Sequence, residues 1–211
     1  DVYKRQDYHR PILIPHLIFS LTEEAFTSRE VENPLLKTHE LAAKWGTPYF
    51  VNSSLKWQEQ PTYFTNGNRL ASDWTGDWEL DTMRTGVLGV VVVNLPRLAR
   101  EFPRDERRFL RALNRHLKTS VDALKRKYST VEKHVNQALL PLLSQSIANE
   151  PYLRLRNSPF IISFAGLNEA TKMQTDKQLC EGQTAVDYAA KIIGHLVLEV
   201  KELSWRSGLR I

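Results

Sequence analysis

The sequence predicts an α/β protein with a mainly parallel sheet. Strand-like and helix-like segments alternate in the second half of the chain, over residues 87–95, 103–140, 160–165 and 184–203. That order is typical of βα units, in which consecutive strands run parallel. The segment 87–95 reads Val-Leu-Gly-Val-Val-Val-Val-Asn-Leu and shows no polar–apolar alternation. Such a continuous β-branched run is typical of a strand that is buried on both faces, and Pro96 ends it.

The longest predicted element is an amphipathic helix over residues 103–140. Its apolar residues recur at steps of three or four and therefore share one face. At 1.5 Å per residue the helix would be about 55 Å long, so a break near residues 128–130 is an alternative. The stripe comprises Leu110, Leu113, Leu117, Val121, Leu124, Tyr128, Val131, Val135 and Leu139.

The first half of the chain contains one clear helix signal. Asn33 and Pro34 form a typical helix start, and Gly46 is a typical helix end. Residues 7–33 are expected to be irregular, because prolines at positions 11 and 15 limit any helix. A strand is predicted directly after the helix, at residues 47–52.

Residues 62–74 are predicted to form a hairpin or a loop tip. Asn66-Gly67 is a strong turn signal at its centre. The acidic stretch 73–81 is predicted to be a loop or a short helix. Two or three strands cannot complete a sheet of this class, so the remaining strands are expected to come from residues outside this chain.

Composition narrows the functional classes. Hydrophobic residues make up 42% of the chain and charged residues 25%, as in ordinary globular domains. No run approaches the roughly 20 apolar residues of a membrane span, so no membrane association is expected. The single cysteine, Cys180, excludes an internal disulfide, and the six histidines include no close pair, so no metal site is expected. A reducing cytoplasm fits this cysteine usage.

A net charge of +5 favours anionic partners. Basic side chains share one face of the long predicted helix and could bind phosphates, which makes a nucleic-acid-binding module one hypothesis. The alternative, which interleaved acidic residues favour, is a solvated face beside the apolar stripe. The basic residues are Arg104, Arg108, Arg111, Arg115, Lys118, Lys125, Arg126 and Lys127.

Residues 66–97 resemble a known family. A turn tip leads into the valine-rich strand, which ends in Asn-Leu-Pro-Arg. This order is similar to that of the large subunit of anaerobic (class III) ribonucleoside-triphosphate reductases, which are glycyl-radical enzymes. Residues 39–52, 137–145 and 162–169 resemble the same family in the same order, so the resemblance spans most of residues 10–203.

The resemblance implies that the chain is an incomplete part of the ten-stranded α/β barrel of these enzymes. In the family, a finger loop inside the barrel carries a Gly-Cys-Arg motif whose cysteine forms a thiyl radical. This chain has Gly67-Asn68-Arg69 there, so Asn68 occupies the expected position of the radical cysteine. By the same resemblance, substrate binding is assigned to Gly67, Arg69, Gly86, Val87 and Asn94.

For the whole protein, the resemblance implies ribonucleotide reduction with formate or a small thiol protein as reductant. A glycyl radical, a zinc ion and ATP or dNTP effectors are expected outside this fragment. The implied partners are a ribonucleoside triphosphate, a radical-SAM activating enzyme and a second subunit in a homodimer. Because an amide cannot form a thiyl radical, a catalytically altered homologue is the alternative to a working reductase.

The domain interpretation has two parts. The first six residues, Asp-Val-Tyr-Lys-Arg-Gln, match a translated sequencing adapter and are expected not to belong to the protein. Residues 7–211 are interpreted as a single fragment of the catalytic barrel domain. We expect that fragment to be inactive by itself.

Overall fold

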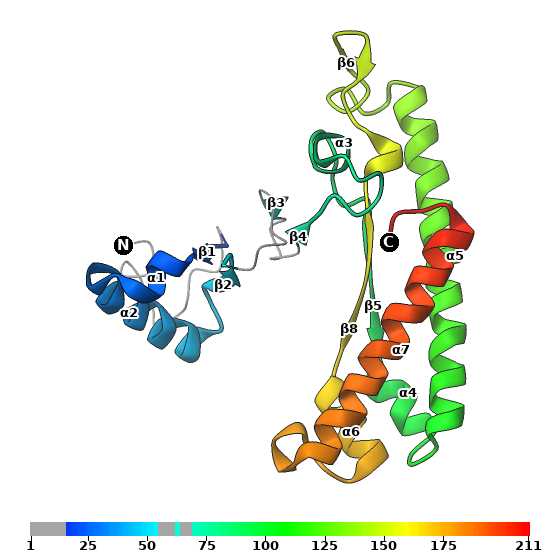
Figure 1. Ribbon diagram of the computed structural model, residues 1–211. Helices are drawn as coiled ribbons and strands as arrows, with labels where there is room; N and C mark the ends of the chain where they lie inside the picture. Colours follow the sequence, from blue (N-terminus) through cyan, green and yellow to red (C-terminus); the bar gives the residue numbers. More distant parts are fainter. Residues whose placement is uncertain (1–15, 55–61, 64–68) are drawn as a thin grey trace, which may run out of the picture. The chain divides into compact units, whose positions relative to one another are not determined.

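The computed structural model describes residues 16–54, 62–63 and 69–211 (Figure 1). Its contacts divide the chain into two compact units, Asp1–Ala71 and Ser72–Ile211. The interpretation of residues 7–211 as one domain fragment stays a prediction.

The first unit contains a parallel strand pair and two helices. Strand β1 (Ile18–Leu21) pairs with β2 (Tyr49–Asn52), and the chain between them forms α1 (Glu23–Thr27) and α2 (Arg29–Trp45). The prediction that residues 7–33 are irregular is therefore wrong for the part from 18 onwards. Two short antiparallel strands, β3 (Thr62–Tyr63) and β4 (Arg69–Leu70), confirm the predicted hairpin pairing.

Helix α2 begins earlier than predicted. Its N-cap is Ser28, so Pro34 lies inside the helix and not at its first turn. Pro34 removes one backbone hydrogen bond, whereas the negative charges of Glu30 and Glu32 favour the helix N-terminus. The predicted end at Gly46 is confirmed: this residue has φ +69°, and its N–H donates to the carbonyl oxygen of Ala42 at 2.7 Å.

The second unit is built on one parallel strand pair, which confirms the α/β prediction. Strand β5 (Gly89–Asn94) and strand β8 (Phe160–Ala165) pair in parallel along their whole length. The chain crosses between them through α4 (Leu95–Glu101) and α5 (Glu106–Asn136). The other elements are α3 (Trp78–Thr82), β6 (Ser146–Ile147), β7 (Glu150–Pro151), η1 (Leu155–Asn157), α6 (Leu167–Thr175), η2 (Leu179–Glu181) and α7 (Gln183–Ser207).

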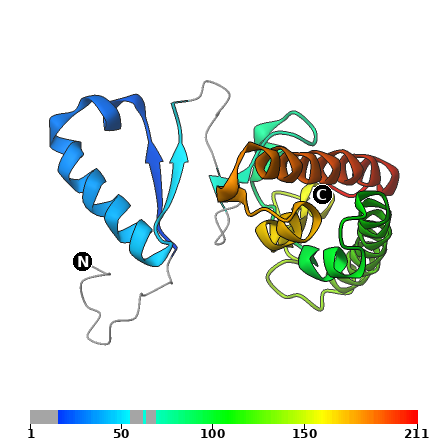
Figure 2. The same cartoon turned by 90° about the horizontal axis from the view of Figure 1, so that it is seen from below.

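Helix α5 is continuous, so the alternative of a break near residues 128–130 is wrong. It starts at the N-cap Asp105, whose carboxylate accepts a hydrogen bond from the backbone N–H of Arg108 at 3.0 Å. Helix α7 runs beside it in both views (Figures 1 and 2). Glu106 and Lys191 join the two helices by an ion pair of 2.6 Å.

The hydrophobic core lies between one face of the strand pair and these helices. Its buried members come from β5, α4, α5, α6 and α7, and they include Val93, Leu95, Leu98, Phe109, Leu113, Leu117, Ala170 and Ile192. On the opposite strand face, Val90 is 48% and Val92 59% exposed among the described residues of this unit. One face of the valine-rich strand is therefore buried as predicted. Coverage of the second face by residues outside this chain stays a prediction.

Across the parts of the chain that the structure describes, no helix combines the length and the apolar character that crossing a bilayer requires.

Tyr188 of α7 gives the core a measurable pH dependence. Burial raises the pKa of Tyr188 to about 12, and the nearby Glu106 carboxylate adds to the rise. Above about pH 10 the unfolded chain releases this proton while the folded chain keeps it. We therefore expect the free energy of unfolding to fall between about pH 10 and pH 12, by on the order of 2 kcal/mol.

Urea unfolding of the wild type and of Tyr188→Phe at several alkaline pH values measures this effect. The hydroxyl of Tyr188 is buried and has no hydrogen-bond partner among the described residues, so the phenylalanine fits. The variant should lose less stability than the wild type over this range. Parallel pH profiles would contradict the account.

Candidate functional site

The segment that precedes β5 is held by a buried carboxylate. Asp81 lies in α3 and is fully buried. Its side chain accepts hydrogen bonds from the backbone N–H groups of Trp74 (3.0 Å) and Thr75 (2.9 Å), from the Thr75 hydroxyl (2.9 Å) and from the Asn157 amide (3.3 Å). These bonds fold the loop of residues 74–81 around one side chain.

Asp81 is ionised in the folded protein. Burial by itself would raise the pKa of Asp81, but hydrogen bonds from Thr75, Trp74 and Asn157 together hold the pKa below its usual value. Four donors converge on this carboxylate, so the charged form is the one that the fold stabilises.

Arg210 attaches this loop to the end of α7. The side chain of Arg210 is buried, and its guanidinium donates to the backbone carbonyl oxygens of Asp81 (2.6 Å) and Asn157 (2.9 Å). A second nitrogen forms an ion pair of 2.5 Å with Asp73. The backbone oxygen of Arg210 also accepts from the N–H of Phe160, the first residue of β8. One arginine therefore connects three segments that are far apart in sequence.

Gly86 and Val87 lie directly before β5, beside the segment that leads into β8. The N–H of Gly86 donates to the Ser158 hydroxyl at 3.3 Å, and the N–H of Leu88 donates to the carbonyl oxygen of Pro159 at 2.9 Å. Arg154 reinforces this attachment, because its guanidinium binds the backbone of Glu79 at 2.6 Å. The start of β5 is thus fixed by backbone and side-chain bonds together.

Asn94, another residue of the predicted substrate set, lies at the opposite end of β5. Its side chain caps α4 by accepting a hydrogen bond from the N–H of Arg97 at 3.0 Å. Asn94 is eight positions after Gly86, which is roughly 26 Å along an extended strand. Gly86 and Val87 are neighbours in sequence, and the structure does not bring Asn94 to them.

The remaining predicted site residues belong to the first part of the chain. Gly67 and Asn68 lie outside the described residues. Arg69 begins β4, where it is paired with Tyr63. The assignment of these residues to a site stays a prediction.

Sequence reasoning missed Asp81, Arg154 and Arg210. Each forms at least one bond to a residue 75 or more positions away, and the local bonds of Asp81 to Trp74 and Thr75 follow no standard capping pattern. A local signal was available for Asp77 only. It caps α3 by accepting from the N–H of Leu80 at 3.1 Å, and an Asp directly before Trp-Glu-Leu is a typical helix start.

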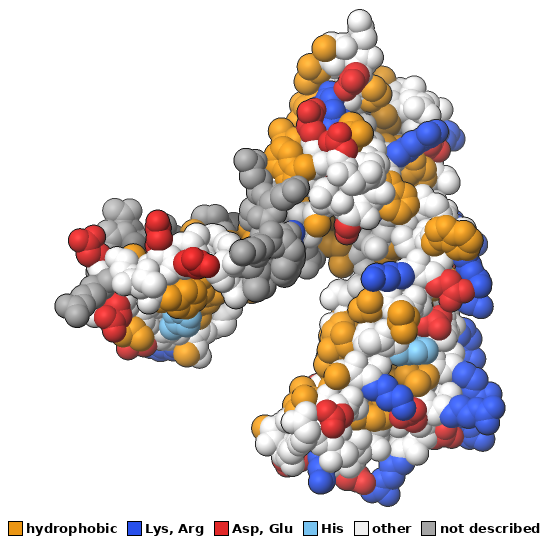
Figure 3. Space-filling model, viewed as in Figure 1, with side chains coloured by type: hydrophobic (Ala, Val, Ile, Leu, Met, Phe, Trp, Pro, Cys, Tyr) orange, Lys and Arg blue, Asp and Glu red, His pale blue; other side chains and the backbone are white. Residues whose placement is uncertain are grey.

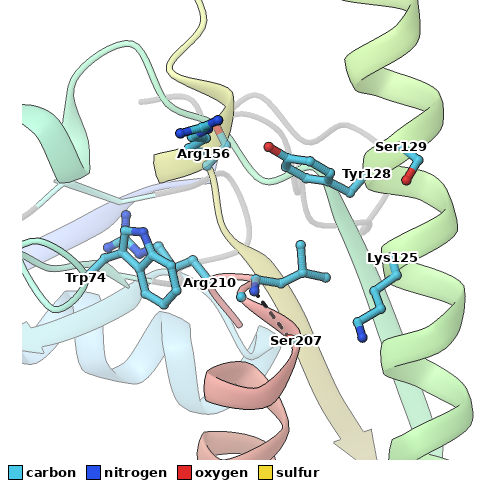
Figure 4. Close-up of a pocket in the computed structure, with 10 residues that line it drawn as sticks. Trp74, Lys125, Tyr128, Ser129, Arg156, Ser207 and Arg210 are labelled. Carbon is cyan, nitrogen blue, oxygen red and sulfur yellow. Dashed lines mark hydrogen bonds between the residues drawn. The ribbon is translucent and has the colours of Figure 1, made fainter.

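A cavity of about 530 Å³ adjoins this network (Figure 4). It is lined by the loop before α3, the middle of α5, η1 and the residues after α7. Two aromatic rings and three basic side chains are among its lining, which comprises Trp74, Lys125, Tyr128, Ser129, Arg156, Ser158, Ser207, Gly208, Leu209 and Arg210. Sequence reasoning did not find this cavity, because four separate segments form it.

The described residues offer no site for a metal or a radical thiol. No group of three or more His, Cys, Asp or Glu side chains among them could hold a metal ion. Cys180 is exposed and lies in η2. The zinc and the redox-active cysteine that the family resemblance implies therefore do not fit the residues described.

The basic residues of α5 form a solvated face. Figure 3 shows Lys and Arg side chains gathered along this helix. Arg104, just before α5, forms an ion pair with Asp176 at 2.8 Å, and Arg108 forms one with Asp105 at 3.4 Å. The others that the sequence analysis named are exposed: Arg111, Arg115, Lys118, Lys125, Arg126 and Lys127.

One family matches the whole chain. It is described as anaerobic ribonucleoside-triphosphate reductase, and the match covers residues 1–211. The chain belongs to this reductase family. Family membership confirms the resemblance given above and favours a reductase part over a nucleic-acid-binding module. No curated protein matches the chain.

Solved structures of anaerobic reductases share the fold. The Thermotoga maritima anaerobic ribonucleotide reductase in complex with dATP and CTP superposes with a TM-score of 0.61 at 19% identity, covering 99% of this chain and 34% of that one. The same reductase with citrate in its active site gives a TM-score of 0.62 at 18% identity, covering 99% and 37%. This chain thus spans about a third of the length of these reductases.

Proposed function

We propose that this chain is part of the catalytic barrel of an anaerobic ribonucleoside-triphosphate reductase homologue, in which Asn68 stands where the family's conversion of ribonucleotides to deoxyribonucleotides needs a cysteine. The observation that supports the proposal is the family match over the whole chain, together with the parallel β5–β8 pair, at the end of which the Asn-Leu-Pro-Arg segment leads into α4. The ten-stranded barrel, the glycyl radical, the effectors, the activating enzyme, the homodimer and a cytoplasmic location belong to the same proposal.

Within this proposal the chain positions the substrate side of β5. The Asp81 and Arg210 network holds the segment before β5, and the N–H of Gly86 donates to the Ser158 hydroxyl. Gly67 and Arg69 are assigned to the substrate by resemblance alone. Asn68 marks the position where the reaction needs a cysteine. Among the residues assigned to the substrate, Asn94 has the least support, because its side-chain oxygen is already used to cap α4.

Binding of CTP to the whole protein that contains this chain tests the proposal. A Cβ atom added at Gly86 meets nothing within 4 Å, so we expect the Gly86→Leu variant to fold. If substrate lies there, the leucine should weaken CTP binding at least about tenfold, which corresponds to roughly 1.4 kcal/mol.

Gly194→Leu on the exposed side of α7 is the matched control, because a Cβ there also meets nothing. It should leave CTP binding unchanged. Failure of the wild type to bind CTP would overturn the proposed function. Normal binding by Gly86→Leu would remove Gly86 from the site only.

A further inference from the structure

The exposed side of α5 carries a line of positive charge that the proposed function does not use. Residues 107–121 contain no Asp or Glu, and their basic side chains at positions 107, 111, 115 and 118 are exposed. At 3.6 residues per turn and 1.5 Å per residue, these positions fall within an arc of about 80° and span about 17 Å of the helix. Figure 3 shows Lys and Arg side chains gathered along this helix. We call Arg107, Arg111, Arg115 and Lys118 the basic line.

The basic line is not neutralised by the fold. Its members form no ion pair within the residues that the structure describes, whereas the neighbouring Arg104 and Arg108 are each paired with an aspartate. Arg111 donates to the backbone carbonyl oxygen of Arg107 at 3.4 Å, and that bond removes no charge. Like charges one turn apart destabilise a helix. A partner of opposite charge would therefore relieve a repulsion that the fold leaves in place.

Packing of α5 holds the basic line in one row. The other side of the helix is part of the core through Phe109, Leu113, Leu117 and Val121, which are all buried. The backbone under the basic line is therefore already ordered before a partner binds. Such preorganisation lowers the entropic cost of binding.

The order of charges along α5 favours a protein partner over a nucleic acid. Asp122 follows Lys118 by one turn on the same face and is exposed, so the row changes sign there. A phosphate backbone is negative throughout and is repelled at Asp122, whereas a protein surface can place carboxylates against the basic line and a basic group against Asp122. Stacking of single-stranded bases needs exposed aromatic rings. Phe109 is the one Phe, Tyr or Trp in residues 107–121, and it is buried.

We propose that the basic line binds a partner protein through an acidic surface, whose Asp and Glu side chains lie in a row against it. The basic line includes none of the residues assigned to the substrate, and its role is association. The inference therefore goes beyond the proposed function, and its test measures binding and not reduction.

Binding of a synthetic acidic helix to the whole protein that contains this chain tests the proposal. The probe is an alanine-based helical peptide whose glutamates repeat at the spacing of the basic line. A second peptide of the same composition, with its glutamates spread around the helix, is the control probe. Isothermal titration calorimetry at low salt should show saturable binding of the first peptide and at least about fivefold weaker binding of the second. Added salt should weaken the binding, because it screens exposed charges.

Removal of the basic line should abolish this preference. The combined variant Arg111→Ala, Arg115→Ala, Lys118→Ala loses three exposed charges and no core contact, and alanine favours the helix. One exposed ion pair changes an affinity by about two- to fivefold. The combined variant should therefore bind the first peptide at least about tenfold more weakly than the wild type.

A charge-matched variant separates the basic line from net charge. Lys37→Ala, Lys177→Ala and Lys201→Ala together remove the same charge from exposed positions outside α5. This control variant should bind the first peptide as tightly as the wild type does.

Four results would each overturn the proposal. The wild type fails to bind the first peptide, or it binds both peptides with equal affinity. The variant of the basic line binds the first peptide as tightly as the wild type does, so the peptide lies elsewhere. Duplex DNA binds more tightly than the first peptide and is lost in the variant of the basic line, which would assign this face of α5 to nucleic acid.

Discussion

Replacement of Asp81 by alanine is expected to destabilise the second unit by about 3–5 kcal/mol, because the substitution leaves several buried donors without an acceptor. Asp81 is fully buried and accepts four hydrogen bonds, from Thr75 (two), Trp74 and Asn157. The loop that leads to β5 should loosen as a result. Urea unfolding measures the loss, and Asp122→Ala on the exposed side of α5 is the control with no expected effect.

The pH dependence gives an independent check on Asp81. Its pKa is lowered on folding, so its contribution to stability is present above the unfolded value near 3.8 and is lost as pH falls through the folded value. Asp81→Asn keeps the shape but cannot ionise, so its stability should lack this acid-dependent component. If wild type and Asp81→Asn lose stability identically below about pH 4, the carboxylate does not have the assigned role.

Replacement of Gly166 by alanine is expected to cost about 2–4 kcal/mol, from strained backbone and from steric overlap. Gly166 precedes α6 with φ +75°, a conformation that residues with a Cβ adopt at a cost. A Cβ placed there would lie 2.2 Å from Cγ of Pro96 in α4. The proline ring is rigid, so the two segments must move apart. Thermal and urea unfolding measure the loss.

The same substitution at Gly194 is the matched control with the opposite expected sign. Gly194 lies within α7, is exposed, and a Cβ there meets nothing within 4 Å. Alanine should therefore stabilise the helix by about 0.5–1 kcal/mol. Equal effects of Gly166→Ala and Gly194→Ala would contradict the close approach of Gly166 to Pro96.

The elements of the second unit could be predicted because their signals are local. The strand at Phe160–Ala165 was predicted at its observed bounds, and α7 extends only one residue earlier and four later than predicted. Helix α5 is shorter than predicted at both ends, because Asp105 caps its start and Asn136 ends it before Leu139. Apolar periodicity marks the middle of a helix, whereas capping bonds decide its ends.

The first unit shows where local signals mislead. Pro34 was interpreted as a helix start, but the chain before it is already helical from Arg29. Strand β1 pairs with β2, which lies about 30 residues later. A pattern within a few neighbouring residues cannot predict such a distant partner. Stacking of His39 on Phe50, with ring centroids 4.1 Å apart, packs α2 against that pair.

The candidate site was predictable only in part, for the same reason. The position of Gly86 and Val87 could be predicted because the valine-rich segment after them is a recognisable strand, β5. The side chains that hold this position come from α3, η1 and the end of α7, and their bonds span up to 129 residues. Burial of an aspartate and an arginine is rare without such partners, so sequence alone gave no reason to select Asp81 or Arg210.

Deoxynucleotide formation from CTP is the most direct test of the reductase assignment. The assay uses the whole protein that contains this chain, under anaerobic conditions, with the family's activating enzyme and reductant and with an active reductase as positive control. The account predicts dCTP from the Asn68→Cys variant and none from the protein with Asn68. Absence of dCTP from the variant while the positive control is active would contradict the assigned function, and dCTP from the Asn68 protein would contradict the assignment of position 68.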